Sequence, residues 1–206
     1  HPMARHARIL NAFADQSVAA LATCGNGQKV LVAGMVSGLK TLYPKSGRNQ
    51  HRKMARFKLE GFDGNVACVI FSDAFERDAE HLVAESIGIV EASVDLSREE
   101  ASLKGDRFIP VERAFEELAG MLAVEPEDGE EERAVQVVKD LLERHSGPTG
   151  VLLRLSPVRG FRAVYRTGGG VTASPDLDRL AVEALGADAV RWKPHKLNPL
   201  LVAPER

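Results

Sequence analysis

A long stretch without acidic residues constrains this chain more than any other feature. Residues 16–59 contain no Asp or Glu, although the chain has 29 acidic residues in 206. The same stretch is rich in lysine and arginine from Lys29 onward. Because the formal net charge of the whole chain is −2, the positive charge is a property of this segment and not of the chain at large. A segment of this kind suits contact with a polyanion.

Two strands and a connecting loop are predicted inside this stretch. The first strand runs from Val30 to about Tyr43, is rich in β-branched residues and contains Gly34 and Gly38. Glycines inside a long strand indicate bulges or the tight coiling found at barrel corners. The segment PKSGRNQHR then has the composition of a loop.

The second strand, over residues 53–62, alternates in polarity. Ala55, Phe57 and Leu59 fall on one side, and Arg56 and Lys58 fall on the other. Strict alternation predicts one buried and one solvent-facing side. The solvent-facing side therefore carries positive charge next to the basic loop.

Three more strands and a helix complete the first part of the chain. The Asp-Gly turn in FDGN is a hairpin signal and leads to a strand over 66–71. A short helix capped by Ser72 or Asp73 and reaching about Val83, a strand over 87–96, the polar connector SREEASLKGD and a short strand over 107–111 follow. A helix over VERAFEELAGML closes this part. This order of elements is that of an OB-fold, a Greek-key barrel whose strand 2–3 face and 1–2 and 4–5 loops bind oligonucleotides.

The remainder of the chain predicts a second, smaller domain after the acidic segment VEPEDGEEE. An amphipathic helix over 133–144 is followed by strands over 151–155 and 161–165. A tight loop at 168–170 leads to a short strand over 171–173, and Ser174-Pro175 begins a helix that reaches about Leu185. A last strand is expected over 189–192.

We therefore expect a mixed β and α+β chain, a five-stranded OB-fold barrel followed by a small α+β domain. The expected parts are a helical lead-in over 1–28, the OB-fold domain over 29–122, an acidic linker over 123–132 and the α+β tail domain over 133–206.

The candidate nucleic-acid-binding residues come from the basic loop, its flanking strands and the region of the 4–5 loop. They are Lys40, Tyr43, Lys45, Arg48, His51, Arg52, Lys53, Arg56, Lys58, Lys104 and Arg107. Cations along a groove neutralise phosphates and make affinity fall with salt. Tyr43, His51 and Phe108 are the candidates for base stacking, whereas Phe57, Phe71 and Phe75 are expected in the core. With few aromatics, we expect mostly electrostatic binding with little sequence preference.

A different interpretation of the basic loop stays open, because cations can simply keep a sheet edge soluble. No other feature of the sequence indicates catalysis or metal binding. The acids Asp73, Glu76, Asp78 and Glu80 suggest a solvated helix face rather than a metal site. We find no zinc spacing and no nucleophile–base arrangement, and we expect no cofactor and no metal.

The absence of a leader and of a long apolar run predicts neither export nor a membrane partner. Cys24 and Cys68 lie outside any pairing motif, which fits a reducing cytoplasm.

Several segments resemble the C-terminal region of the bacterial DNA polymerase III alpha subunit. HPMARHARIL resembles that family's Gly-His-Pro-Leu segment, VLVAGMVSGLKTLYPKSG its first OB strand and loop, and MARFKLEGFDGNVACVIFSDAFE its next two strands. LLERHSGPTGVLLRL and VTASPDLDRLAVEALG are similar to its tail domain.

The resemblance implies a non-catalytic part of a replicase, joined to the remainder of the polymerase chain, whose catalytic aspartates lie outside this sequence. In that family the OB-fold domain binds single-stranded template DNA, and the tail domain contacts the tau subunit of the clamp loader. Two other hypotheses remain: a tRNA anticodon-binding OB module, and an OB-fold protein–protein module that meets an acidic partner.

Overall fold

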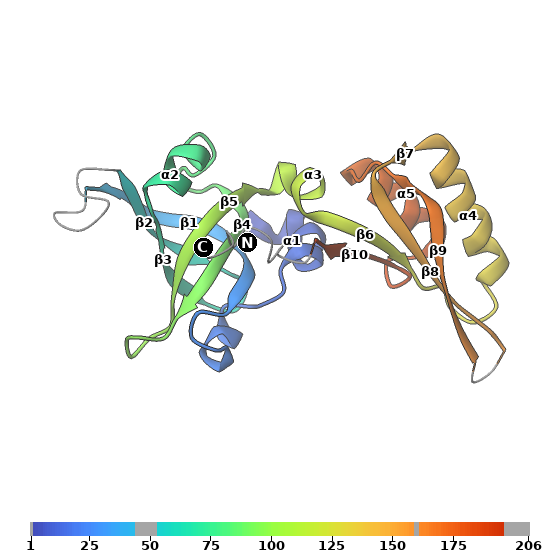
Figure 1. The fold of residues 1–206 in the computed structure, drawn as a ribbon, viewed down its shortest axis with the longest axis horizontal. Helices are drawn as coiled ribbons and strands as arrows, with labels where there is room; N and C mark the ends of the chain where they lie inside the picture. The colour runs from blue at the N-terminus through green and yellow to red at the C-terminus, as the bar shows by residue number, and fades with distance from the viewer. Residues whose placement is uncertain (1, 44–52, 159–160, 196–206) are drawn as a thin grey trace, which may run out of the picture. The chain divides into compact units, whose positions relative to one another are not determined.

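The computed structural model describes residues 2–43, 53–158 and 161–195 (Figure 1). The chain forms two compact units, His1–Ala114 and Phe115–Arg206. None of the helices within the described ranges is long and apolar enough to cross a membrane.

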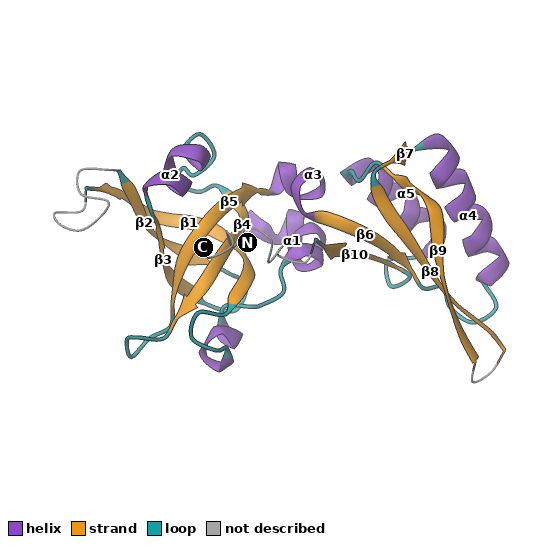
Figure 2. Cartoon of the chain, in the orientation of Figure 1, coloured by secondary structure: helices purple, strands orange, loops and turns teal. Residues whose placement is uncertain are grey.

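The first unit is built on a closed five-stranded barrel. Its strands are β1 (Lys29–Leu42), β2 (Met54–Glu60), β3 (Asn65–Ile70), β4 (Ile87–Asp95) and β5 (Ser102–Pro110). They close in the order β1-β2-β3-β5-β4, with β3 and β5 parallel and the other neighbours antiparallel. The helix α2 (Ser72–Asp78) lies between β3 and β4 in the chain (Figure 2). The OB-fold predicted from the order of elements is confirmed.

Two glycines let β1 coil around the barrel, as the sequence predicted. A Cβ on Gly34 would lie 2.6 Å from Cγ of Leu59 and 2.9 Å from the carbonyl oxygen of Glu60. Gly38 has a φ of +58°, and the register between β1 and β2 shifts between Ser37 and Lys40. Glycine suits both positions, because a side chain at Gly34 would clash with its neighbours and the left-handed backbone at Gly38 is strained for other residues.

Alternate residues of the five strands fill the barrel. Phe57, Leu59, Cys68, Ile70, Leu103 and Phe108 are at most 2% exposed. Phe57 and Phe75 are core residues, as expected, with Phe75 at 9% exposure. Burial raises the pKa of the Cys68 thiol, so this cysteine stays protonated inside the barrel.

A short segment before the barrel covers part of its outer surface. It comprises η1 (Pro2–His6), α1 (Ala7–Phe13) and η2 (Ala19–Thr23). Met3, Leu10 and Phe13 are fully buried, and α1 packs against β1 and β4. The helical lead-in is therefore shorter and more broken than its periodicity predicts.

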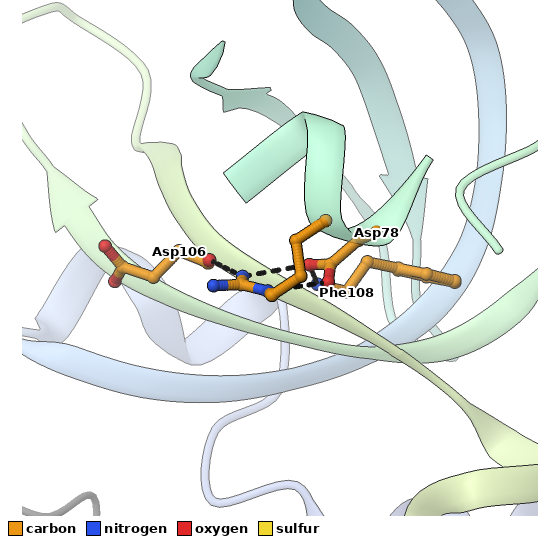
Figure 3. A network of polar contacts seen from close by, with 4 residues as sticks. Asp78, Asp106 and Phe108 are labelled. Atoms are coloured by element: carbon orange, nitrogen blue, oxygen red, sulfur yellow. Dashed lines mark hydrogen bonds and ion pairs between the residues drawn. The ribbon is translucent and has the colours of Figure 1, made fainter. Parts of the chain in front are cut away.

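One buried carboxylate fixes α2 on β5 (Figure 3). Asp78 is 6% exposed, and its Oδ2 accepts a hydrogen bond of 2.8 Å from the backbone N–H of Phe108. Arg77 donates to both carboxylate oxygens at 2.9 and 3.1 Å, and also to the carbonyl of Asp106. The hydrogen bond to Asp78 raises the pKa of Arg77. The expectation of a wholly solvated acidic face was wrong for Asp78, because this residue turns toward the barrel.

Two differences from the expected elements lie near the end of the barrel. Strand β5 begins at Ser102 instead of Arg107, so half of the expected polar connector is strand. The helix expected over 111–122 is limited to η3 (Val111–Arg113) and α3 (Ala114–Leu118), and β6 (Ala119–Val124) follows. A short apolar run such as AGMLAV fits a buried strand or a buried helix equally well, which explains the error.

The described part of the second unit contains a mixed sheet and helices that include most of α3. Its elements after β6 are α4 (Glu131–Arg144), β7 (Ser146–Gly147), β8 (Thr149–Val158), β9 (Phe161–Val171), α5 (Pro175–Leu185) and β10 (Val190–Pro194). The strands lie in the order β10-β6-β8-β9-β7. Residues 168–170 continue β9 rather than forming the expected tight loop. The predicted cap is present, because Oγ of Ser174 accepts a hydrogen bond of 3.1 Å from the N–H of Leu177.

The boundary between the units falls between Ala114 and Phe115 in the chain, whereas the sequence predicted a linker over 123–132. Val124 ends β6 and is fully buried, and Glu131 already begins α4. The acidic segment is thus the connection between two elements of the second unit.

Candidate nucleic-acid interface

A groove of about 290 Å³ lies on the outer surface of the barrel, over β2, β3, β5 and the loop from β4 to β5. Arg56, Arg98 and Lys104 line it as cations, and Asp95 lines it as an anion. Its apolar lining includes Leu42, Met54, Val69 and Phe71. Cations beside an apolar floor can bind a phosphate backbone and a base at the same time.

The strand register brings three of the predicted binding residues into one row. Lys40 on β1 is opposite Arg56 on β2, Arg56 is opposite Val69 on β3, and Val69 is opposite Lys104 on β5. Neighbouring strands are about 4.8 Å apart, so the row spans about 14 Å across the sheet. Lys58 is exposed in the next row, opposite Ala67.

The groove also holds one carboxylate that opposes binding of an anion. Asp95 lies 2.9 Å from Nζ of Lys104. The hydrogen bond from Lys104, followed by that from Ser97, lowers the pKa of Asp95 to about 2. Asp95 is therefore ionised at neutral pH, and it neutralises part of the charge that Lys104 offers to a phosphate.

Replacing Asp95 by asparagine is expected to raise affinity for single-stranded oligo-dT by about threefold or more at low salt, because it removes an anion and releases Lys104 for phosphate contact. The gain should shrink as salt screens the charges. Fluorescence anisotropy at two salt concentrations measures the effect. Glu132→Gln, at an exposed residue of α4 in the second unit, makes the same charge change outside the groove residues. An Asp95→Asn affinity equal to that control would show that this groove is not used.

The structure changes the set of aromatic residues that can stack on a base. Phe71 follows β3, is 40% exposed and lines the groove, so the expectation that it lies in the core was wrong. Phe108 was a stacking candidate, but it is 2% exposed and packs inside the barrel. Tyr43 is 57% exposed directly after β1 and remains available.

The other predicted residues are not all in one place. Lys53 is exposed just before β2. Lys45, Arg48, His51 and Arg52 lie outside the described residues. Arg107 is half-buried and opposite Glu91, outside the set of residues that line the groove. Burial, followed by the charge of Asp106, raises the pKa of Glu91, and Arg107 acts against this rise.

Sequence reasoning missed Arg98, which reaches the groove from the loop between β4 and β5. The signal was present, because this loop is one of the two that bind oligonucleotides in OB-folds. In the described ranges no group of three or more His, Cys, Asp or Glu side chains is placed to hold a metal ion.

One family model matches the barrel. Residues 30–111 match the family model tRNA_anti-codon, described as an OB-fold nucleic acid binding domain. These residues contain all five strands of the OB-fold domain except Lys29, and they include the groove.

Most of the chain is also similar to a polymerase subunit. It is 28% identical over 192 residues to DNA polymerase III subunit alpha from Deinococcus radiodurans, covering 87% of this chain and 14% of the relative. The resemblance to this family expected from the motifs is confirmed. The chain spans about one seventh of the length of the relative it matches.

Two solved structures share only a limited part of the chain. An OBody, AM1L10, bound to hen egg-white lysozyme is 18% identical, with 41% of this chain and 79% of that chain covered and a TM-score of 0.31. The asparaginyl-tRNA synthetase from Pyrococcus horikoshii is 22% identical, with 41% of this chain and 20% of that chain covered and a TM-score of 0.31. Neither likeness is close enough to bear on function.

Proposed function

We propose that this chain is a non-catalytic part of a bacterial replicative DNA polymerase alpha subunit and binds single-stranded template DNA in the groove of its OB-fold domain. The groove supports this most directly, because it combines Arg56, Arg98 and Lys104 with the exposed ring of Phe71. The similarity to a polymerase III alpha subunit supplies the context. A replicase part of this kind works in the cytoplasm, joined to the remainder of the polymerase chain.

A salt titration of binding to oligo-dT, tRNA and duplex DNA tests this proposal. Single-stranded DNA should bind most tightly, and log affinity should fall with log salt by about 0.7 for each phosphate neutralised. Preference for tRNA would instead support the second candidate, an anticodon-binding module, which the name of the matching family model favours. Absence of binding to all three would support the protein–protein hypothesis.

The second unit, on this proposal, docks the tau subunit of the clamp loader. Strand β9 pairs with β8 along its length, but with β7 only at Gly170 and Val171. The remainder of β9 therefore has one open edge among the described residues, and Tyr165 on it is 56% exposed. An open edge with an exposed aromatic side chain is a common docking surface for a partner protein.

Tyr165→Ser is expected to weaken binding of tau by about tenfold, because truncating a central aromatic contact usually has an effect of this size. Calorimetric titration of tau into the full chain measures it. Val83→Ser removes a side chain that is 49% exposed in the first unit and serves as the control. Equal tau affinity in the two variants would exclude this edge as the docking site.

A further inference from the structure

The two long helices of the second unit, α4 and α5, lie on the same face of its sheet. Nε1 of Trp192 donates a hydrogen bond of 2.8 Å to Oδ1 of Asp178, which places Trp192 of β10 toward α5. Helix α4 contacts α5 and packs on β7, β8 and β9. Both helices therefore lie on the side of the sheet that Trp192 faces. Since side chains alternate along a strand, the neighbours of Trp192 face the other side.

The other side, here called the open face because neither α4 nor α5 lies on it, is basic, with exposed cations around two buried residues, Ala123 and Leu152. In register across four strands, Arg191 is opposite Ala123, Ala123 is opposite Leu152, and Leu152 is opposite Arg166. Lys193 shares this side with Arg191, and Arg162 shares it with Arg166 by alternation along β9. Arg154 is the fifth cation and lies opposite Val164.

Within the described ranges, few carboxylates neutralise the positive charge of these side chains. Arg154 is 3.4 Å from a carboxylate oxygen of Glu125. The other four, Arg162, Arg166, Arg191 and Lys193, are exposed, and no described carboxylate pairs with them. Like charges gathered on one face repel each other, so such a face is more stable when an anion covers it.

We propose that the open face of the second unit is a further binding surface for a nucleic-acid backbone, separate from the groove of the OB-fold domain. Arg191 and Arg166 are three strand spacings apart, which is about 14 Å. That span exceeds the 3.4 Å axial rise per charge of one DNA strand several times, so the two arginines would contact different phosphates. Four of the five cations are arginines, whose planar guanidinium groups bind phosphate in a bidentate manner.

This surface goes beyond the proposed function, which needs only the groove. Both features would bind the same kind of ligand, because a strand that leaves the groove remains polyanionic along its length. An acidic protein is the other partner that the charge could suit. It is less favoured because the same chain carries an OB-fold nucleic acid binding domain.

The test measures binding of the full chain to oligo-dT of about 30 nucleotides, longer than the 4–16 that one OB-fold binds. Arg166→Glu with Arg191→Glu is expected to lower affinity by about tenfold and to reduce the salt slope by about 1.4. Arg133→Glu with Lys139→Glu on α4 changes charge equally on the helical side and should leave affinity unchanged. Thermal melting confirms that each variant is folded. If the first pair does not fold, Arg162→Glu with Lys193→Glu replaces it.

The outcomes distinguish failure of this inference from failure of the proposed function. An open-face variant that binds as tightly as the α4 control would overturn this inference and leave the groove untouched. A loss in the open-face variant, together with full binding by a chain whose groove cations are reversed, would support the open face and contradict the proposed function.

Discussion

Replacing Arg56 and Lys104 by glutamate is expected to lower affinity for short oligo-dT by about tenfold or more at low salt. The two side chains lie in one row across the groove, on either side of Val69, so both act on the same stretch of backbone. Reversal removes two phosphate contacts and adds repulsion. Since each contact on a single strand contributes about 0.7 to the salt slope, the slope should fall by about 1.4.

The α4 pair Arg133→Glu with Lys139→Glu is the matched control, because it changes the net charge equally and lies in the other unit. Anisotropy titrations at several salt concentrations give both the affinity and the slope. If the groove pair and the α4 pair lose affinity equally, attraction to the whole chain explains binding and the site assignment fails.

Gly88→Ala is expected to destabilise the first unit by about 2–4 kcal/mol, because overpacking against a rigid neighbour forces backbone movement. Gly88 lies on β4 opposite Gly34 on β1 and Pro110 on β5. A Cβ at this position would overlap the carbonyl oxygen of Ile109 and lie 2.8 Å from Cζ of Phe108. The midpoint of thermal unfolding of this unit should fall by roughly 10–20 °C.

Gly25→Ala separates this overlap from the general effect of replacing a glycine. A Cβ on Gly25 would meet nothing closer than 3.7 Å, and its φ is not in the left-handed region. Differential scanning calorimetry of both variants makes the comparison. Equal midpoints of thermal unfolding in the two variants would mean that the strands around Gly88 can accommodate a Cβ, contrary to the prediction.

Local patterns were enough to predict the barrel. Alternation marked the buried side of β2, the Asp-Gly turn marked the β2–β3 hairpin, and Gly34 and Gly38 marked the coiling of β1. These signals are local, because each reflects the conformation of a few neighbouring residues. The order of the elements then restricted the topology to one known barrel.

The errors occurred where contacts between distant segments decide the outcome. Asp78 is buried because β5, later in the chain, presents the N–H of Phe108 to it. Arg107 lies opposite Glu91 instead of in the groove, which depends on the bulge between β4 and β5. The open face escaped prediction because β10 pairs with β6, far away in the chain. Nothing in either segment alone indicates that pairing.

The pairing of β6 with β10 also affects the chain while it is being synthesised. β6 ends at Val124, and its outer partner begins only at Val190. During translation, most of the second unit leaves the ribosome while one edge of β6, with its apolar side chains, is still unpaired. Because unpaired apolar edges invite association between nascent chains, we expect this unit to be most prone to aggregation until β10 has been synthesised.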